Sequence, residues 1–341
     1  MKVAMYYNNH DVRLEEMPIP EINDDELLVK VIASGICGSD LMEWYRIKKA
    51  PVVLGHEIAG DIVKAGKNVK NFKVGDRVFA THHVPCKTCD FCLNDQQTLC
   101  DTLHSTKFYP GGFAQYLRVP EINVDRGTFK LPDKMSYEEG TFIEPLGCGV
   151  RGFRIMDFKP GKTVLILGSG IAGLLNIKLA KAYGAKLIFA TDIDKNRLKI
   201  AKKMGADAAI NAKGNVAEKI KKANNGKLAD YVILCIGVPS AVKQAIESVE
   251  FGGTILWFAM TPPGVDVPVP FFDIWNKQIK TFSTYAAVEQ DLAEAIELIK
   301  SKKVIVTDMI THRLPLKDTQ KGFRLVEEGK ESIKVIIEPQ K

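Results

Sequence analysis

Apolar and polar positions follow different patterns in the first third of the chain and in its middle. Residues 1–120 contain short runs rich in β-branched residues, such as Leu27–Ile32 and Ile58–Val63. Glycine-containing turns separate these runs, and helical spacing is rare. This pattern predicts a region built from short β-strands.

From Thr163 onward, apolar runs of strand length alternate with amphipathic segments. Helices are expected over about Ile171–Tyr183 and Lys195–Met204, between runs that read TVLILG, LIFATD, YVILCIG and TILWFAM. Such alternation is typical of a doubly wound parallel sheet. The chain then ends with one clear helix, Glu289–Lys300, and a strand-like KVIIEP.

The sequence therefore predicts an α/β protein of two domains, as its length of 341 residues also suggests. We expect one domain from residues 1–147 and 282–341, and a second domain, which contains the alternating strands and helices, from residues 148–281.

Composition narrows the protein class. Hydrophobic residues make up 46% of the chain, and the net charge of +6 is spread along it, without the basic block expected of a nucleic-acid binder. No signal peptide is visible, and no run approaches the roughly 20 apolar residues of a membrane span. We therefore expect a cytoplasmic protein that binds neither membranes nor nucleic acid. Its seven cysteines are then expected to serve metal binding or catalysis rather than disulfides.

Four cysteines are clustered in one segment, with the spacing C-x2-C-x2-C-x7-C. These are Cys86, Cys89, Cys92 and Cys100. Four thiolates can surround one zinc ion and leave no open position, which predicts a structural zinc site. An iron–sulfur cluster is an alternative, but such runs usually continue with proline, and here Asp101 follows. The segment is slightly acidic, which argues against a nucleic-acid-binding zinc ribbon.

A glycine-rich turn indicates a dinucleotide site. Gly168, Gly170 and Gly173 form GxGxxG directly after a strand pattern and before a helix that starts at about Ile171. Such glycines allow a tight turn, close approach of a pyrophosphate, and close packing of helix on strand. The helix N-terminus also offers free N–H groups to phosphates.

An acidic residue at the end of the next strand pattern favours NAD over NADP. Asp192 lies 19 residues beyond Gly173, where a carboxylate can accept hydrogen bonds from the ribose 2′-hydroxyl. Asp194 fits the role of helix cap better than Asp192. Lys195 and Arg197 are nearby cations that leave NADP open as an alternative.

Four further residues are candidate ligands of a catalytic zinc: Cys37, His56, Glu57 and Glu144. A mixed set of thiolate, imidazole and carboxylate is typical of catalytic zinc sites. Taken singly, each is as readily a core or surface residue, so the set depends on the motifs around it.

The motifs together resemble the zinc-containing medium-chain dehydrogenase/reductase family, and within it the sorbitol and threonine dehydrogenase branch. They are GICGSD at 35–40, GHE at 55–57, the four cysteines, GGFAQY at 111–116, IEPLG at 143–147 and GSGIAG at 168–173. The resemblance implies a GroES-like catalytic domain and a Rossmann domain. It also implies zinc-dependent oxidation of a secondary alcohol, such as a polyol, to a ketone, with hydride transfer to NAD.

The resemblance assigns roles to residues of this chain. It implies that Cys37, His56 and Glu144 ligate the catalytic zinc, with Glu57 as an exchangeable ligand or a partner of the ligands. Ser39 would pass the substrate proton outward. The cofactor contacts it implies, beyond the glycines and Asp192, are Ile171, Arg197, Phe258, Met260, Ser283 and Tyr285. A homotetramer or homodimer is implied as well.

Two departures from the family pattern concern the proton path and the substrate. Many relatives carry a relay histidine where this chain has Met42, and sorbitol dehydrogenases carry an arginine where it has Thr284. The alternatives left open are a threonine-type dehydrogenase, an NADP-linked reductase, and a zinc- and nucleotide-binding protein without turnover.

Overall fold

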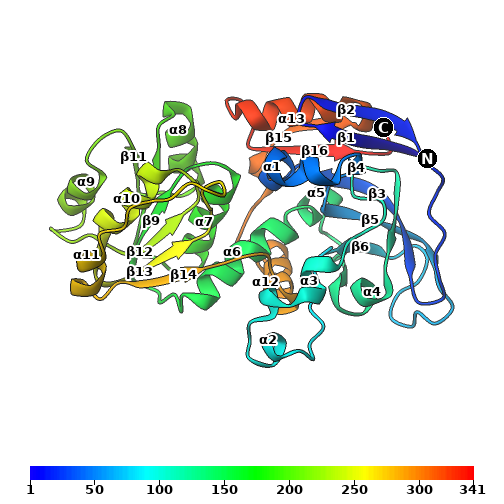
Figure 1. The fold of residues 1–341 in the computed structure, drawn as a ribbon, viewed down its shortest axis with the longest axis horizontal. Helices are drawn as coiled ribbons and strands as arrows, with labels where there is room; N and C mark the ends of the chain where they lie inside the picture. The colour runs from blue at the N-terminus through cyan, green and yellow to red at the C-terminus, as the bar shows by residue number, and fades with distance from the viewer. The chain divides into compact units, whose positions relative to one another are not determined.

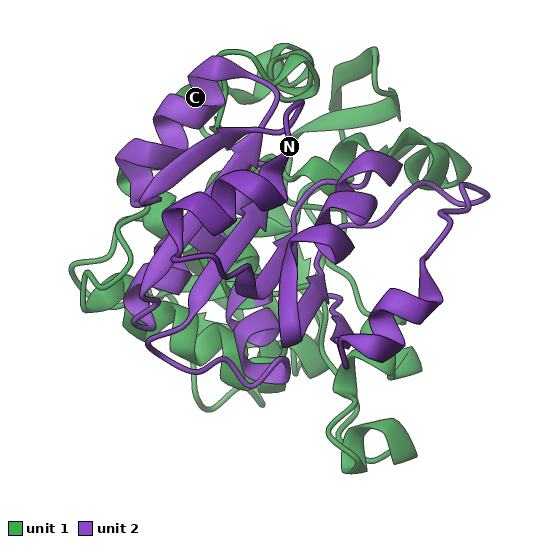
Figure 2. Ribbon diagram, turned by 90° about the vertical axis from the view of Figure 1, so that its left-hand side faces the viewer, with its two compact units in different colours: residues 1–147, 286–341 green, residues 148–285 purple.

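A computed structural model describes residues 1–341. Contacts within the chain divide it into two compact units, residues 1–147 with 286–341, and residues 148–285 (Figure 2). The chain thus leaves the first unit, forms the second and returns. Helix α6 (Ile143–Ile155) carries the chain from the first unit into the second.

The first unit consists mainly of β-strands. They are β1 (Lys2–Asn8), β2 (Asp11–Glu16), β3 (Leu27–Gly35), β4 (Val52–Val53), β5 (Glu57–Ala65), β6 (Arg77–Ala80), β7 (Tyr116–Val119), β8 (Thr128–Lys130), β15 (Ile310–Pro315) and β16 (Lys334–Glu338). Seven of them form one sheet in the order β15-β16-β3-β5-β6-β8, with β7 paired to β3, and β2-β1-β4 form a second (Figure 1).

The helices of the first unit are mostly short. They are α1 (Glu43–Arg46), α2 (Asp90–Leu93), α3 (Asp101–Ser105), α4 (Glu121–Gly127), α5 (Tyr137–Gly140), α12 (Glu289–Lys300) and α13 (Thr319–Glu328). Alternate residues of the paired strands β3 and β5, such as Leu27, Val29 and Ile58, meet in one buried cluster. This two-residue period is what a sheet with one face on a core requires.

The second unit is a six-stranded parallel sheet. Its strands are β9 (Thr163–Leu167), β10 (Leu187–Asp192), β11 (Ala208–Asn211), β12 (Ala229–Leu234), β13 (Val249–Trp257) and β14 (Lys280–Ser283), in the order β11-β10-β9-β12-β13-β14. Strand order reverses between β9 and β12, and ligands of such sheets bind at the carboxyl ends of the strands near this point.

Five helices belong to this second unit: α7 (Ile171–Ala182), α8 (Lys195–Met204), α9 (Val216–Ala223), α10 (Pro239–Ser248) and α11 (Phe271–Asn276). Helix α7 packs with α8, and α9 packs with α10, on opposite faces of the sheet (Figure 1). All five residues of β9 are buried, which explains why every residue after Thr163 in this strand is apolar.

The predicted α/β class and the parallel sheet are confirmed, and the helices expected at Lys195–Met204 and Glu289–Lys300 have those bounds. The expectation of a single helix after residue 280 was wrong. Helix α13 is a second one, whose face carrying Phe323 is buried. No helix in the structure combines the length and the apolar character needed to cross a membrane.

Candidate active site and nucleotide-binding site

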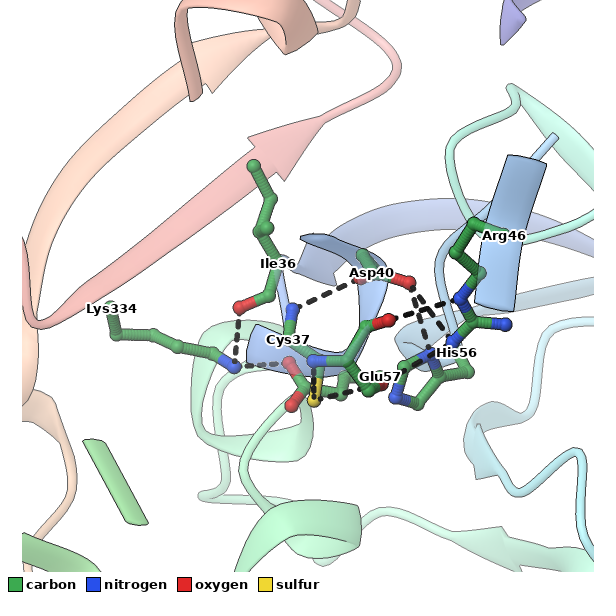
Figure 3. Close-up of polar contacts among 8 residues, drawn as sticks. Ile36, Cys37, Asp40, Arg46, His56, Glu57 and Lys334 are labelled. Atoms are coloured by element: carbon green, nitrogen blue, oxygen red, sulfur yellow. Dashed lines mark hydrogen bonds and ion pairs between the residues drawn. The ribbon is translucent and has the colours of Figure 1, made fainter. Parts of the chain in front are cut away.

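Strand pairing brings together three of the predicted zinc ligands. Strands β3 and β5 are antiparallel, and Gly35 pairs with Glu57, so the residues just beyond Gly35 lie beside the start of β5. Cys37 then caps a short 3₁₀ helix, Gly38–Leu41. The ligand atoms of Cys37, His56 and Glu57 all lie within 4.8 Å of one another (Figure 3). These are a sulfur, a nitrogen and an oxygen, which suits zinc.

The orientation of His56 is set by Asp40. Nδ1 of His56 lies 3.5 Å from Oδ1 of the fully buried Asp40, and Oδ2 of Asp40 accepts a hydrogen bond of 3.0 Å from the Cys37 backbone. A carboxylate on one ring nitrogen orients a metal-binding histidine, and Nε2 of His56 would then be the nitrogen that holds a metal ion.

Electrostatics favour a charged His56 as long as no metal is bound. Burial would lower the pKa of His56, but Asp40 and Cys37 together raise it well above its ordinary value. Burial raises the pKa of Asp40, yet His56 and Arg46 outweigh burial and leave it lowered. A metal ion at Nε2 would therefore displace a proton.

Glu57 forms a buried ion pair with a lysine from the far end of the chain. Nζ of Lys334 on β16 forms an ion pair with Oε2 of Glu57, and both side chains are 1% exposed. The same Nζ donates to the carbonyl oxygen of Ile36 at 3.3 Å. A side chain at position 35 would clash, because a Cβ on Gly35 would lie 2.6 Å from Cε of Lys334. Glu57 thus lies among the candidate ligands and already has a partner.

Glu144 does not belong to the group formed by Cys37, His56 and Glu57. It lies in the first turn of α6 and is 8% exposed. Its role as a ligand therefore stays a prediction.

Ser39 lies next to Cys37, as its sequence position requires. Its hydroxyl donates to Sγ of Cys37 at 3.4 Å, and its backbone N–H lies 3.5 Å from the same sulfur. A hydroxyl at this point is placed to exchange hydrogen bonds with whatever oxygen binds beside the sulfur.

Two further histidines lie beside His56. The His82 ring lies 4.8 Å from the His56 ring and 3.7 Å from the His83 ring, centroid to centroid. Burial lowers the pKa of His82 well below its ordinary value and that of His83 to about 3. Both imidazoles are therefore neutral near pH 7.

The four clustered cysteines converge, as their spacing predicts. Their sulfurs all lie within 4.8 Å of one another, and none forms a disulfide. Hydrogen bonds from Thr88 and from the Cys89 backbone lower the pKa of Cys86 to about 5, whereas burial raises that of Cys92 to about 12. Four sulfurs at this distance fit one tetrahedral metal ion with no open position.

The glycine-rich turn has the geometry that its motif predicts. Gly168 has φ of +95° after β9, and Gly170 caps α7. A Cβ on Gly173 would collide with the carbonyl group of Gly168, so only glycine allows the helix to pack this closely. Around Gly170 the nearest atom to such a Cβ is Nη1 of Arg197, at 3.6 Å, which leaves space beside the helix N-terminus.

Asp192 ends β10 and is 8% exposed. Its Oδ2 accepts from the Ser169 backbone at 3.0 Å, its Oδ1 accepts from the Asp194 backbone at 2.9 Å, and Nη1 of Arg197 lies 3.9 Å from Oδ2. Asp194 caps α8 through the N–H groups of Asn196 and Arg197. The carboxylate of Asp192 thus also orders the glycine turn.

The remaining predicted cofactor residues follow the carboxyl ends of parallel strands. Ile171 begins α7 after β9, Phe258 and Met260 follow β13, Ser283 ends β14, and Tyr285 comes two residues later. This is the edge at which doubly wound sheets bind nucleotides.

Comparison with known proteins agrees with this geometry. The family description "Alcohol dehydrogenase GroES-like domain" matches residues 23–133, and "Zinc-binding dehydrogenase" matches residues 172–301. Sorbitol dehydrogenase of Bacillus subtilis is 35% identical over 99% of this chain and 97% of its own length. "Probable D-xylulose reductase A" of Aspergillus fumigatus is 36% identical over 96% of this chain and 94% of its own length. A Sinorhizobium meliloti protein solved with NADP has a TM-score of 0.88 at 28% identity, covering 99% of both chains.

The chain therefore belongs to the zinc-binding, medium-chain dehydrogenase family, with a GroES-like domain and a Rossmann-type domain. Its similarity to sorbitol dehydrogenases and xylulose reductases places it in the polyol dehydrogenase branch.

The structure adds site residues that the sequence did not indicate. They are Asp40, Arg46, His82 and Lys334. Asp40 lies within the GICGSD motif, so its closeness to Cys37 was a possible signal. Lys334 had none, because it meets Glu57 only through the pairing of β16 with β3.

Proposed function

We propose that this protein oxidises a secondary alcohol of a polyol to a ketone and transfers the hydride to NAD. The observation that carries the proposal is the convergence of Cys37, His56 and Glu57 in a chain that matches a sorbitol dehydrogenase along nearly its whole length.

The residues fit a catalytic zinc. We assign Cys37 and His56 as ligands, and Glu144 as the third. Glu57, which forms an ion pair with Lys334, would be an exchangeable ligand. The donor set supports this, because a thiolate and an oriented imidazole bind zinc while leaving a position for substrate. Zinc, when bound, would lower the pKa of an alcohol oxygen, as it does for water.

Ser39 is the residue that we assign to proton transfer. Its hydroxyl lies 3.4 Å from Sγ of Cys37 and can accept a hydrogen from an alcohol bound there. The Ser39→Ala variant is expected to lose activity and to change its pH profile. An unchanged profile would remove Ser39 from the proton path.

We assign the four cysteines Cys86, Cys89, Cys92 and Cys100 to a structural zinc. Their convergence within 4.8 Å supports this assignment. Metal analysis of the purified protein is expected to give about two zinc ions per chain. A value near one would leave only a structural site and favour a protein without turnover.

For the cofactor, we favour NAD over NADP. Asp192 ends β10 and would repel a 2′-phosphate, which supports NAD. Arg197 beside it, and the NADP found in the Sinorhizobium meliloti protein, favour NADP as the second candidate. Gly168, Gly170, Gly173 and the strand-end residues named above would line this site.

One assay tests these points together. Rates of NADH and NADPH formation are measured with a panel of polyols, simple secondary alcohols and threonine. We expect the highest kcat/KM with NAD and a polyol. Preference for threonine or for NADP would support the corresponding alternative, and no rate with any pair would refute the dehydrogenase proposal.

We further propose that residues 1–147 with 282–341 form the catalytic domain and residues 148–281 the nucleotide domain, in a cytoplasmic homo-oligomer. The last point rests on the resemblance to the medium-chain dehydrogenase family alone. Light scattering of the purified protein tests it, and a monomer at micromolar concentration would contradict it.

A further inference from the structure

One arginine contacts Ser39 and Asp40, the residues that contact the proposed zinc ligands Cys37 and His56. Arg46 ends α1, and its Nε donates to the backbone oxygen of Ser39 at 3.0 Å. Its Nη2 donates to the hydroxyl of Ser39 at 3.3 Å and lies 3.8 Å from Oδ1 of Asp40 (Figure 3). Ser39 in turn donates to Cys37, and Asp40 faces His56.

The arginine is held firmly enough to act as a fixed group. Its side chain is 16% exposed, and its guanidinium lies 5.0 Å from the centre of the Tyr45 ring. A planar guanidinium with several N–H groups in fixed directions can hold more than one acceptor at once.

Arg46 lies one helical turn beyond Met42, the position at which the family resemblance implies a relay histidine. A methionine thioether is only a weak acceptor, whereas a guanidinium donates hydrogen bonds but stays protonated at ordinary pH. Arg46 can therefore orient the hydroxyl of Ser39 but cannot carry a proton away from it.

We propose that Arg46 is a positioning residue of the dehydrogenase site that orients the hydroxyl of Ser39. A serine hydroxyl has one hydrogen and two lone pairs. Nη2 of Arg46 occupies one lone pair and the hydrogen points to Sγ of Cys37, so the second lone pair remains for the hydroxyl of a substrate. Through Asp40, the same guanidinium steadies His56. This inference rests on the proposed function.

The kinetic test uses Arg46→Ala, Arg46→Lys and, as a matched control, Lys49→Ala. Lys49 also lies over the Tyr45 ring, at 4.4 Å, and donates to the Tyr45 hydroxyl, so the control removes one positive charge from the same ring. We expect kcat with NAD and a polyol to fall about 10- to 100-fold in Arg46→Ala, and about tenfold in Arg46→Lys, which keeps the charge but not the fork. The control should stay within about twofold of the parent.

A double-mutant cycle separates positioning from a general structural effect. Because Arg46 acts on the chemistry through Ser39, most of the Arg46→Ala loss should disappear in the Ser39→Ala background. An undiminished loss in that background would overturn the proposal, as would Arg46 variants that match the Lys49→Ala control.

A second readout does not depend on turnover. Loss of zinc to a chelator is followed in the same variants, and the weaker-bound zinc should leave about ten times faster in Arg46→Ala than in Lys49→Ala. Equal release rates would overturn the link through Asp40. If the parent protein shows no rate with any alcohol, the proposed function fails, and zinc release still decides whether Arg46 supports the metal site.

Discussion

The pair of Glu57 and Lys334 gives the sharpest test of how the site is built. Both side chains are 1% exposed, so replacing Lys334 by methionine leaves a buried carboxylate without its partner. Removing one member of a buried ion pair typically costs about 3–5 kcal/mol. We expect Lys334→Met to lower the free energy of unfolding by about this amount, a large part of the stability of an ordinary domain.

The double variant Lys334→Met with Glu57→Gln should recover much of this loss. Removing both charges leaves no unpaired charge, and such replacements are often nearly neutral. Lys330→Met, at an exposed position shortly before Lys334, serves as a control and should change the free energy by less than about 0.5 kcal/mol.

The assay is urea unfolding followed by tryptophan fluorescence, with excess zinc so that metal loss does not contribute. The midpoints of the four proteins are compared at a shared slope. A loss below about 1 kcal/mol for Lys334→Met would show that Glu57 has another partner, such as the metal. A double variant no more stable than Lys334→Met would refute the reasoning about the unpaired carboxylate.

Three further predictions concern the metal sites and the cofactor. Replacing Asp192 by alanine should raise the KM for NAD by roughly 10- to 100-fold and reduce the preference for NAD over NADP, because a charged hydrogen bond to the ribose is lost. An unchanged ratio of kcat/KM for NAD to kcat/KM for NADP would show that Asp192 only orders the glycine turn. Replacing Cys100 by serine should reduce bound zinc from about two ions per chain to about one and lower the midpoint of thermal unfolding, because a structural zinc contributes to folding. If atomic absorption still finds two ions per chain, the four-thiolate site is contradicted. Zinc affinity at Cys37 and His56 should fall as pH is lowered, since the pKa of metal-free His56 is raised and protons compete for its ring nitrogen. The affinity is measured by competition with a chelator, and a zinc affinity that is constant from pH 8 to pH 6 would exclude this competition.

Much of the fold could be predicted because it depends on local pattern. The alternation of apolar strands and amphipathic helices after Thr163 defines the parallel sheet, and Lys195–Met204 has both a clear apolar face and a capping residue, Asp194. Helix α13 is as long as α8, but its first turn has no side-chain cap and Gly322 lies inside it, so the local signals for a helix are weaker there. Its buried face becomes apparent only when Phe323 is seen to pack with Val3 and Tyr6 of the first strand.

Features in which neighbouring residues act together follow from the local amino-acid order. The four cysteines lie within fifteen positions, and the glycines surround a single turn, so the chain between them is too short to separate their atoms widely. The cap of α8 is likewise local.

Contacts between distant residues depend instead on how the strands pair and pack. Cys37 meets His56 and Glu57 because β3 pairs with β5 in one register, and Lys334 reaches Glu57 because β16 pairs with β3. Register depends on the packing of whole strands and on the faces they bury, and this information is spread over many positions. The sequence could propose the ligands one by one, but the pairing of the sheet decided which of them meet and gave Glu57 a buried lysine as its partner.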